Sequence, residues 1–118
     1  MDGIGNPIPP SIVAAEKETR MFEQAYRYRF AERVDMRGAE DLVFLSILAA
    51  DGLFGEARVR MDAAYAVDES IRALVIDAGT PVGLVVNCIF TAFALREFGP
   101  CAIHVRRVEA FGPLGEVR

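Results

Sequence analysis

The chain has 118 residues, 53% of them hydrophobic, and its mean hydropathy is +0.25. This composition excludes an intrinsically disordered chain and is typical of one globular domain. The formal net charge of -4 and the pI of about 5.0 argue against sequence-independent binding to nucleic acid, which requires surplus positive charge.

The first ten residues hold three prolines and two glycines, which predicts an extended segment over 1–10. This segment has neither the basic region nor the apolar region of a signal peptide, so we expect a cytoplasmic protein. Next, Ser11 as an N-cap and apolar residues at helical spacing predict a helix that reaches Phe22.

From Tyr26 to Val34 the period changes, because aromatic residues alternate with arginines. The aromatic residues are Tyr26, Tyr28 and Phe30, and the arginines are Arg27, Arg29 and Arg33. Alternation predicts a half-buried strand with its aromatic side chains inward and its arginines outward. A helix that continues from Ser11 is the alternative, since Phe22, Tyr26 and Phe30 also fit a four-residue step.

The apolar run 42–50 follows two acidic residues, Glu40 and Asp41, and precedes Asp51-Gly52. Acidic residues suit the positive N-terminus of a helix, and glycine commonly follows a helix end. This pattern predicts a helix over 39–50. A buried strand that ends in an Asp-Gly hairpin is the alternative.

Alternation over 57–67 predicts a second strand, with Val59, Met61 and Tyr65 on one face and arginines on the other. Residues 68–70 form a short polar connection, and the run 71–77 predicts a central strand. We therefore expect a hairpin between these two strands.

Thr80-Pro81 is a strong helix start and Gly99-Pro100 is an equally strong stop, so the sequence predicts a helix over 81–98. The run 101–108 predicts the last strand, followed by a loose tail over 109–118. The expected fold class is therefore α+β. It has an N-terminal helix and then the βαββαβ order of a ferredoxin-like fold, with an antiparallel sheet and helices on one face.

The two longer predicted helices are apolar almost all the way round. Eighteen residues from Ala78 to Leu95 carry no charge. Because this run is interrupted by polar residues and is shorter than the roughly twenty apolar residues of a membrane span, we expect no transmembrane helix. A two-layer fold buries one face of each helix, so we expect a second copy of the chain, most simply in a homodimer, to cover the other. Cover by the N-terminal helix or the tails is the alternative.

Each of these helices also carries a stripe of small or weakly polar residues, which would let two helices approach closely. Ala39 and Ala50 belong to the first stripe. We expect the interface of the homodimer to contain five residues of the stripes: Val43, Ser46, Gly83, Asn87 and Thr91. A buried Asn87 must find a hydrogen-bond partner, and its copy across the two-fold axis is one candidate.

Arginine outnumbers lysine by twelve to one, and many arginines fall on the outward faces of predicted strands. The planar guanidinium suits carboxylate and phosphate, so we predict a site for a small anion. Its residues are Arg27, Arg29, Arg58, Arg60, His104 and Arg106. The alternative is a solvated face with acidic partners such as Glu32 and Asp62. Recognition of RNA on this face is not expected, because the aromatic residues point the other way.

Other chemistry is poorly supported by the sequence. The stretch "DAGTPVG" holds two glycines before a helix, but Thr80 as a cap explains it, and Asp77 fits a turn better than a catalytic acid. We expect Cys88 and Cys101 to be buried, reduced thiols. With His104 as the only histidine, and on the opposite strand face from Cys101, we expect neither a metal site nor a cofactor.

The segments "TPVGLVVNCIFTAFALREFG" and "CAIHVRRV" resemble small bacterial proteins of uncharacterised function, including orphan products of mobile integron cassettes. The resemblance covers about a quarter of the chain and implies no activity. We expect a non-enzymatic, oligomeric module that binds a small anionic or amphipathic ligand or a partner protein. The alternatives are a small enzyme with a pocket near Asp77 and His104, and a protein–protein adaptor.

Overall fold

The computed structural model describes residues 24–108, so the predictions for 1–10, 109–118 and the helix from Ser11 lie outside the described residues. The described part contains four strands, three α-helices and two single turns of 3-10 helix. In chain order these are β1 (Ala25–Phe30), α2 (Met36–Phe54), α3 (Glu56–Asp62), β2 (Tyr65–Asp68), η1 (Glu69–Ile71), β3 (Ala73–Asp77), α4 (Pro81–Phe98), η2 (Pro100–Ala102) and β4 (Ile103–Val108).

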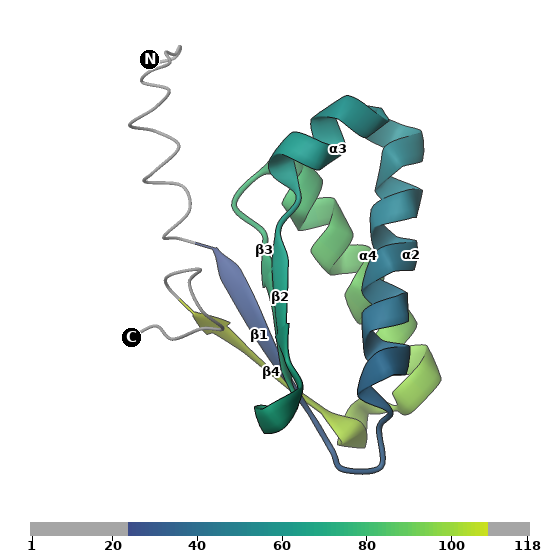
Figure 1. Cartoon of the computed structure of the whole chain (residues 1–118), viewed down its shortest axis with the longest axis vertical. Helices are drawn as coiled ribbons and strands as arrows, with labels where there is room; N and C mark the ends of the chain where they lie inside the picture. The colour runs from purple at the N-terminus through teal and green to yellow at the C-terminus, as the bar shows by residue number, and fades with distance from the viewer. Residues whose placement is uncertain (1–23, 109–118) are drawn as a thin grey trace.

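The four strands form one sheet in the order β2-β3-β1-β4, and every neighbouring pair is antiparallel. Helices α2 and α4 lie side by side on one face of this sheet, and α3 lies at its end (Figure 1). The core fills the space between the sheet and the two helices, and its largest fully buried side chains include Tyr28, Phe90, Leu74 and Ile76. The predicted α+β class with one antiparallel sheet is confirmed.

Strand β1 confirms the strand that alternation predicted, in place of a continuing helix. Tyr28 and Phe30 are buried, Tyr26 is half-buried and Arg29 is exposed. The strand ends at Phe30, earlier than predicted, so Arg33 lies in the following loop. Because the aromatic rings face the helices, they offer no stacking surface on the opposite side of the sheet.

The helix predicted over 39–50 is α2, which is longer at both ends. Asp35 caps it, with its Oδ1 accepting a hydrogen bond from the Arg37 main-chain N–H at 3.1 Å. The helix passes through Asp51-Gly52 and ends at Gly55, whose φ of 91° lies in the region that favours glycine. The hairpin alternative is wrong.

The predicted strand over 57–67 is wrong in its first half, where the chain forms α3. Only Val59 of α3 is buried, so the apparent alternation with Ala57 and Met61 carried no information about a buried face. The signal that sequence reasoning missed is charge spacing. Two salt bridges of i,i+4 spacing stabilise the helix, Arg60–Glu56 at 2.8 Å and Arg58–Asp62 at 3.7 Å.

The predicted hairpin is confirmed as β2–β3. Asp68 closes it with its Oδ1, which accepts hydrogen bonds from the main-chain N–H and the hydroxyl of Ser70. Arg72 follows in the left-handed conformation, with a φ of 53°. Its guanidinium donates to the main-chain carbonyls of Ala31, Glu32 and Val34, which ties the loop after β1 to the start of β3.

Helix α4 confirms the predicted start at Thr80-Pro81. The Thr80 hydroxyl accepts from the Gly83 main-chain N–H at 2.8 Å and donates to the Asp62 carbonyl at 3.1 Å. Gly99, with a φ of 89°, ends the helix. Among the described residues, α4 is the one helix with the length and apolar composition of a membrane span, a property that core helices of water-soluble proteins share.

The small-residue stripes of both helices face the interior. Ala39, Val43, Ser46 and Ala50 are fully buried in α2. In α4, Gly83 and Asn87 are buried and Thr91 is half-buried. The predicted use of these positions in an interface between two copies therefore needs correction, because packing within the chain, where α2 and α4 lie against each other, already buries all but Thr91.

A polar cluster joins α4 to the central strand β1. The hydroxyl of Tyr28 donates to Asn87 Oδ1 at 2.6 Å and lies 2.7 Å from the hydroxyl oxygen of Thr91. The Tyr28 ring also packs edge-on against Phe90, with their centroids 4.9 Å apart. Asn87 thus has a hydrogen-bond partner within the chain.

We expect Tyr28→Phe to lower the free energy of unfolding by about 1–3 kcal/mol, because Asn87 Oδ1 then stays buried without a donor. Urea denaturation measures this change, with Tyr26→Phe as a control at a less buried position. An unchanged stability in the Tyr28 variant would show that this hydrogen bond contributes nothing.

The buried Tyr28 side chain should also make the free energy of unfolding depend on pH in the alkaline range. Burial raises the pKa of Tyr28 from 10.0 to about 12. The unfolded chain therefore loses this proton first, so stability is full below pH 10 and falls as the pH rises toward 12, by about 3 kcal/mol in total. Denaturation across this range should show the fall in the native sequence and a smaller one in Tyr28→Phe.

The tightest contact between helix and sheet lies at Gly83. A β-carbon at this position would sit 2.1 Å from the main-chain oxygen of Asp77. Glycine is required there because backbone cannot move aside as the end of a flexible side chain can.

We expect Gly83→Ala to destabilise the fold by about 3 kcal/mol or more, since it forces α4 away from β3. Gly52→Ala is the matched control, because Gly52 also lies in a helix and has open space around it. This control should raise stability by about 0.5–1 kcal/mol. Thermal unfolding followed by circular dichroism compares the two, and equal effects would contradict the close contact.

Candidate anion-binding site

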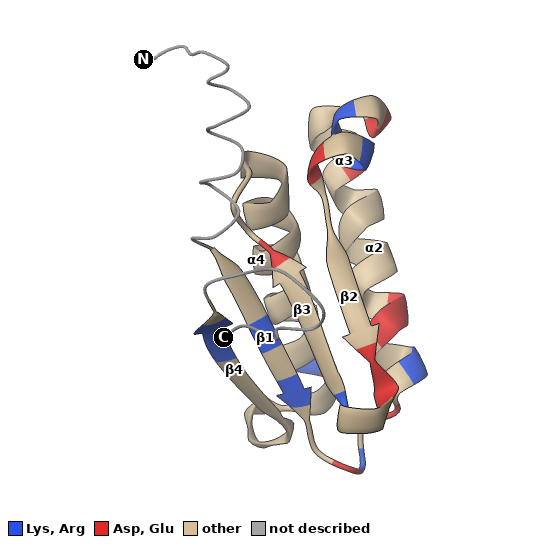
Figure 2. Ribbon diagram, turned by 60° about the vertical axis from the view of Figure 1, so that its left-hand side comes forward, with Lys and Arg blue, Asp and Glu red and all other residues tan. Residues whose placement is uncertain are grey.

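Four of the six basic residues predicted for an anion site lie together on β1 and β4. In the ladder between these strands, Arg27 is opposite Arg106 and Arg29 is opposite His104. Residues directly opposite each other point to the same side of a sheet. All four therefore project from the face opposite the described helices, and Figure 2 shows the arginines of β1 and β4 on neighbouring strands. We call Arg27, Arg29, His104 and Arg106 the basic cluster.

Within residues 24–108 no salt bridge involves any member of the basic cluster. Their neighbours on β3 are small and apolar, with Val75 opposite Arg27 and Ala73 opposite Arg29. The predicted acidic partners lie elsewhere, because Glu32 is exposed in the loop after β1 and Asp62 pairs with Arg58. Like charges facing each other across strands destabilise a sheet, so this arrangement favours a bound counter-charge.

Within the basic cluster, Arg27 has a buried hydrogen-bond donor to which no described residue offers an acceptor. Its Nε is buried and has no hydrogen-bond partner in the structure. A buried donor without a partner costs about 1–3 kcal/mol, which an oxygen of a bound anion would recover. Arg27 lies in a central strand, so the ladders on both sides hold the backbone from which its side chain projects.

A hollow of about 420 Å³ opens at the end of the cluster, where β1 ends and β4 begins. Arg29 and His104 line it together with Phe30, Ile103 and Cys101. Sequence reasoning placed Cys101 and His104 on opposite faces of one strand. Cys101 instead lies in the turn η2, before β4 starts, so both side chains border the same hollow.

The remaining two predicted site residues, Arg58 and Arg60, do not join the cluster. Both lie on α3, each paired with an acidic residue of the same helix. Their assignment to the site depended on the strand predicted over 57–67. Since that segment is a helix at the end of the sheet, the six-residue site reduces to four residues.

The structure also separates Asp77 and His104, the two residues expected to form a pocket in an enzyme. Asp77 lies opposite Ala25, whereas His104 lies opposite Arg29, four residues further along β1. Asp77 and His104 lie on strands to either side of β1, so about 3.3 Å per residue along the strand and about 4.8 Å between strands place them about 16 Å apart. Asp77 Oδ1 accepts from the Gly79 main-chain N–H at 2.9 Å, as in a turn. The structure therefore does not bring Asp77 and His104 into one site.

The thiols differ from expectation, because Cys88 and Cys101 are both exposed. Cys88 lies on the side of α4 that faces away from the core, and neither cysteine forms a disulfide. In the described part of the chain, no group of three or more histidine, cysteine, aspartate or glutamate side chains lies close enough to hold a metal ion.

The solvent side of the helix layer is apolar. Five large side chains on this side are 43% to 60% exposed, and together with Cys88 we call them the outer helix face. They are Phe44, Leu45 and Leu48 of α2, and Leu84 and Leu95 of α4. The sequence indicated that these helices have no polar side. On α2 the exposed apolar positions are opposite to the small-residue stripe, whereas on α4 Leu95 lies one turn from Thr91, on the same side of the helix.

Comparison with protein-family models, with curated proteins and with solved structures found no match to this chain. The basic cluster, the hollow beside it and the outer helix face are the features from which function is inferred.

Proposed function

We propose that the chain is a non-enzymatic module that binds a small anionic ligand at the basic cluster. The observation that carries this proposal is the two cross-strand pairs, Arg27 opposite Arg106 and Arg29 opposite His104, which form no salt bridge within the described residues. Phosphate and carboxylate groups fit best, because two arginine forks can bind their oxygens bidentately. The hollow beside Arg29 would hold the rest of the ligand, against Phe30 and Ile103.

We further propose that the fold is ferredoxin-like. Two observations support this assignment: the chain order β1-α2-β2-β3-α4-β4, with α3 as an extension of the first connection, and the central position of β1 and β3. In this arrangement the described helices all lie on the other face of the sheet from the basic cluster.

We also propose that the protein forms a homodimer through the outer helix face. Burying the exposed half of one large apolar side chain contributes about 1 kcal/mol. Five such side chains on each of two copies contribute about 10 kcal/mol, which is comparable to the association cost of about 4–15 kcal/mol.

The anion site is tested with inorganic phosphate, pyrophosphate and citrate as probes. We expect at least one of them to raise the melting temperature, since a ligand that binds only the folded state stabilises it. Arg29→Gln and Arg106→Gln should each weaken binding about tenfold or more, because a charged hydrogen bond is worth about 1.5–3 kcal/mol. Isothermal titration calorimetry at several salt concentrations gives the affinities.

Arg58→Gln and Arg60→Gln are the matched controls, because they remove the same charge from α3, outside the basic cluster. These variants should bind the probes as the native sequence does. Equal losses in all four variants would indicate binding by net charge alone, and no response to any probe would remove the proposal.

The homodimer is tested with the two exposed thiols. Cys88 belongs to the outer helix face and Cys101 does not, so a thiol reagent should modify Cys88 more slowly as protein concentration rises, while Cys101 stays equally reactive. Leu48→Glu should abolish this difference and give the 12.9 kDa monomer in sedimentation. A native chain that sediments as a monomer at high concentration would refute the dimer.

A further inference from the structure

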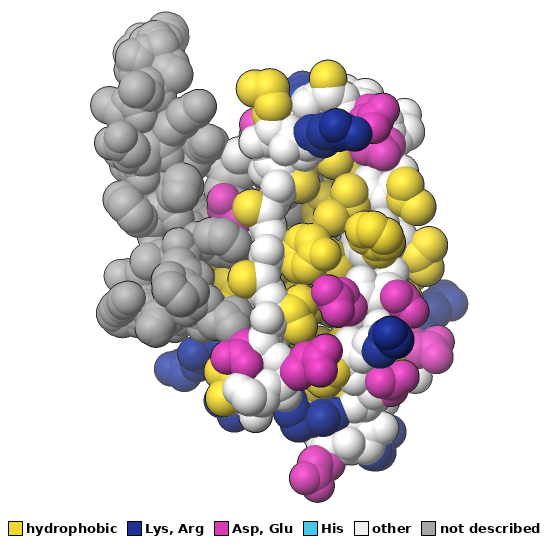
Figure 3. All heavy atoms as spheres, in the orientation of Figure 1, with side chains coloured by type: hydrophobic (Ala, Val, Ile, Leu, Met, Phe, Trp, Pro, Cys, Tyr) yellow, Lys and Arg dark blue, Asp and Glu magenta, His cyan; other side chains and the backbone are white. Residues whose placement is uncertain are grey.

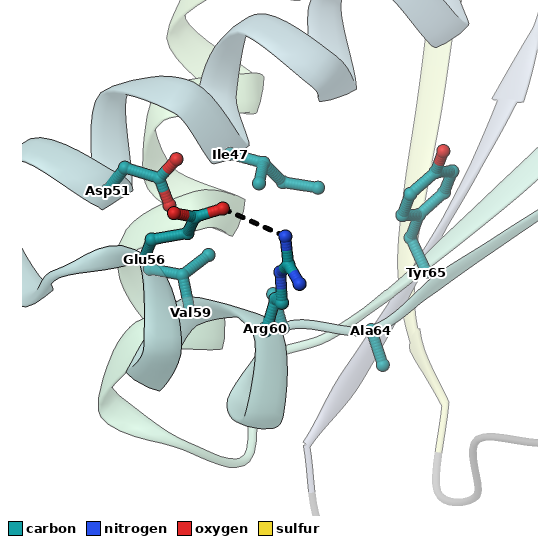
Figure 4. A pocket seen from close by; sticks show the side chains of 8 residues that line it. Ile47, Asp51, Glu56, Val59, Arg60, Ala64 and Tyr65 are labelled. Carbon is teal, nitrogen blue, oxygen red and sulfur yellow. Dashed lines mark hydrogen bonds and ion pairs between the residues drawn. The ribbon is translucent and has the colours of Figure 1, made fainter.

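A second hollow lies on the flank of the molecule, between β2 and the helices α2 and α3. Its volume is about 380 Å³. Figure 3 shows hydrophobic side chains inside this hollow, next to the backbone of the edge strand. Ile47, Val59 and Tyr65 form its apolar part, and Asp51, Glu56 and Arg60 lie at its polar end (Figure 4).

The strand that borders this hollow is an open edge of the sheet. Strand β2 pairs only with β3 among the described strands. The Ala64 carbonyl accepts from the Asp77 main-chain N–H, so Ala64 and every second residue after it turn toward β3. By the alternation of an antiparallel ladder, the main-chain N–H and C=O groups of Tyr65 and Val67 turn outward, toward the edge.

The side chains of the same two residues lie on the helix side of the sheet. Tyr65 is opposite Ile76 and Val67 is opposite Leu74, and both of these β3 residues belong to the core. A strand added beside β2 would therefore pair with the main chain of Tyr65 and Val67. Its alternate side chains would point into the hollow.

The charge around the hollow is negative. Asp51 Oδ1 is buried and has no hydrogen-bond partner in the structure. Arg60 does not supply one, because its guanidinium pairs with Glu56 at 2.8 Å. The pKa of Tyr65 is raised from its usual value by burial, and to a smaller extent by the charge of Glu40. Glu40 therefore adds to the negative charge near the hollow. A second copy of the chain would bring the same acidic groups to the contact, so a basic partner fits better.

We propose that the edge of β2 and the adjoining hollow bind an extended segment of another protein, rich in basic and apolar residues, as an additional strand of the sheet. An apolar side chain of that segment fills the hollow, and a lysine or arginine two residues away, on the same face of the added strand, donates to Asp51. This site is separate from the basic cluster, which lies on β1 and β4.

The probe is a short synthetic peptide with capped ends, in which valine and lysine alternate along one face of the strand and threonine occupies the positions between them. Titrated into the isotopically labelled full chain, it should shift the amide resonances of 64–68 and slow hydrogen exchange at Tyr65 and Val67. A peptide with glutamate in place of lysine should bind about tenfold more weakly or not at all. A peptide N-methylated along one edge cannot complete the ladder and should lose binding to the unaltered protein.

Protein variants give an independent measurement. Val67→Pro removes an outward N–H but no bond to β3, and should weaken binding of the valine–lysine peptide about tenfold. Asp51→Asn should weaken it by a similar factor, whereas Glu97→Gln on α4, which makes the same charge change outside the hollow, should not. Fluorescence anisotropy of a labelled peptide gives the affinities.

Three outcomes would overturn the proposal. The N-methylated or the acidic peptide could bind as well as the original, which would exclude strand addition or charge selection. The shifts could map to the outer helix face. Slow exchange at Tyr65 and Val67 could appear without peptide as protein concentration rises, which would assign this edge to a second copy of the chain.

Discussion

Small side chains on the inner faces of α2 and α4 let the two helices pack closely against each other and let α4 pack against β3, and the surface of the molecule follows from this packing. At Gly83 no β-carbon fits beside the Asp77 carbonyl. Ser46 and Val43 of α2 are also fully buried. Because a two-layer fold gives each helix one inner face, and small residues occupy it, bulky residues such as Phe44 and Leu48 remain outside.

Two polar arrangements then specify how the layers are aligned. The hydroxyl of Tyr28 holds Asn87 of α4 over the central strand, and the guanidinium of Arg72 gathers the carbonyls of the loop that leads from β1 to α2. Sliding either element would leave buried polar groups without partners, at about 1–3 kcal/mol each. Apolar contacts alone would tolerate such a shift more easily, so these hydrogen bonds favour one register of helix on sheet.

Although the net charge is -4, positive and negative side chains gather on separate surfaces of the molecule. Strand alternation sends Arg27 and Arg29 to the helix-free face, while acidic groups such as Asp51 collect at the flank beside β2. The arginines of α3 form ion pairs with acidic residues of the same helix, and they lie apart from the basic cluster. The two proposed ligand surfaces therefore carry opposite charges, whereas the members of the outer helix face are apolar.

The sequence by itself determined the elements with local signals. The cap at Thr80, the stop at Gly99 and the aromatic alternation of β1 depend on neighbouring residues, so they were predictable. It also placed four of the six basic residues correctly, because both strands that carry them were recognised. Tertiary structure alone decided which side of each apolar helix is buried, since an all-apolar pattern has no preferred face. It likewise decided the partner of Asn87 and the hollow beside β2, because both arise where segments distant in the chain meet.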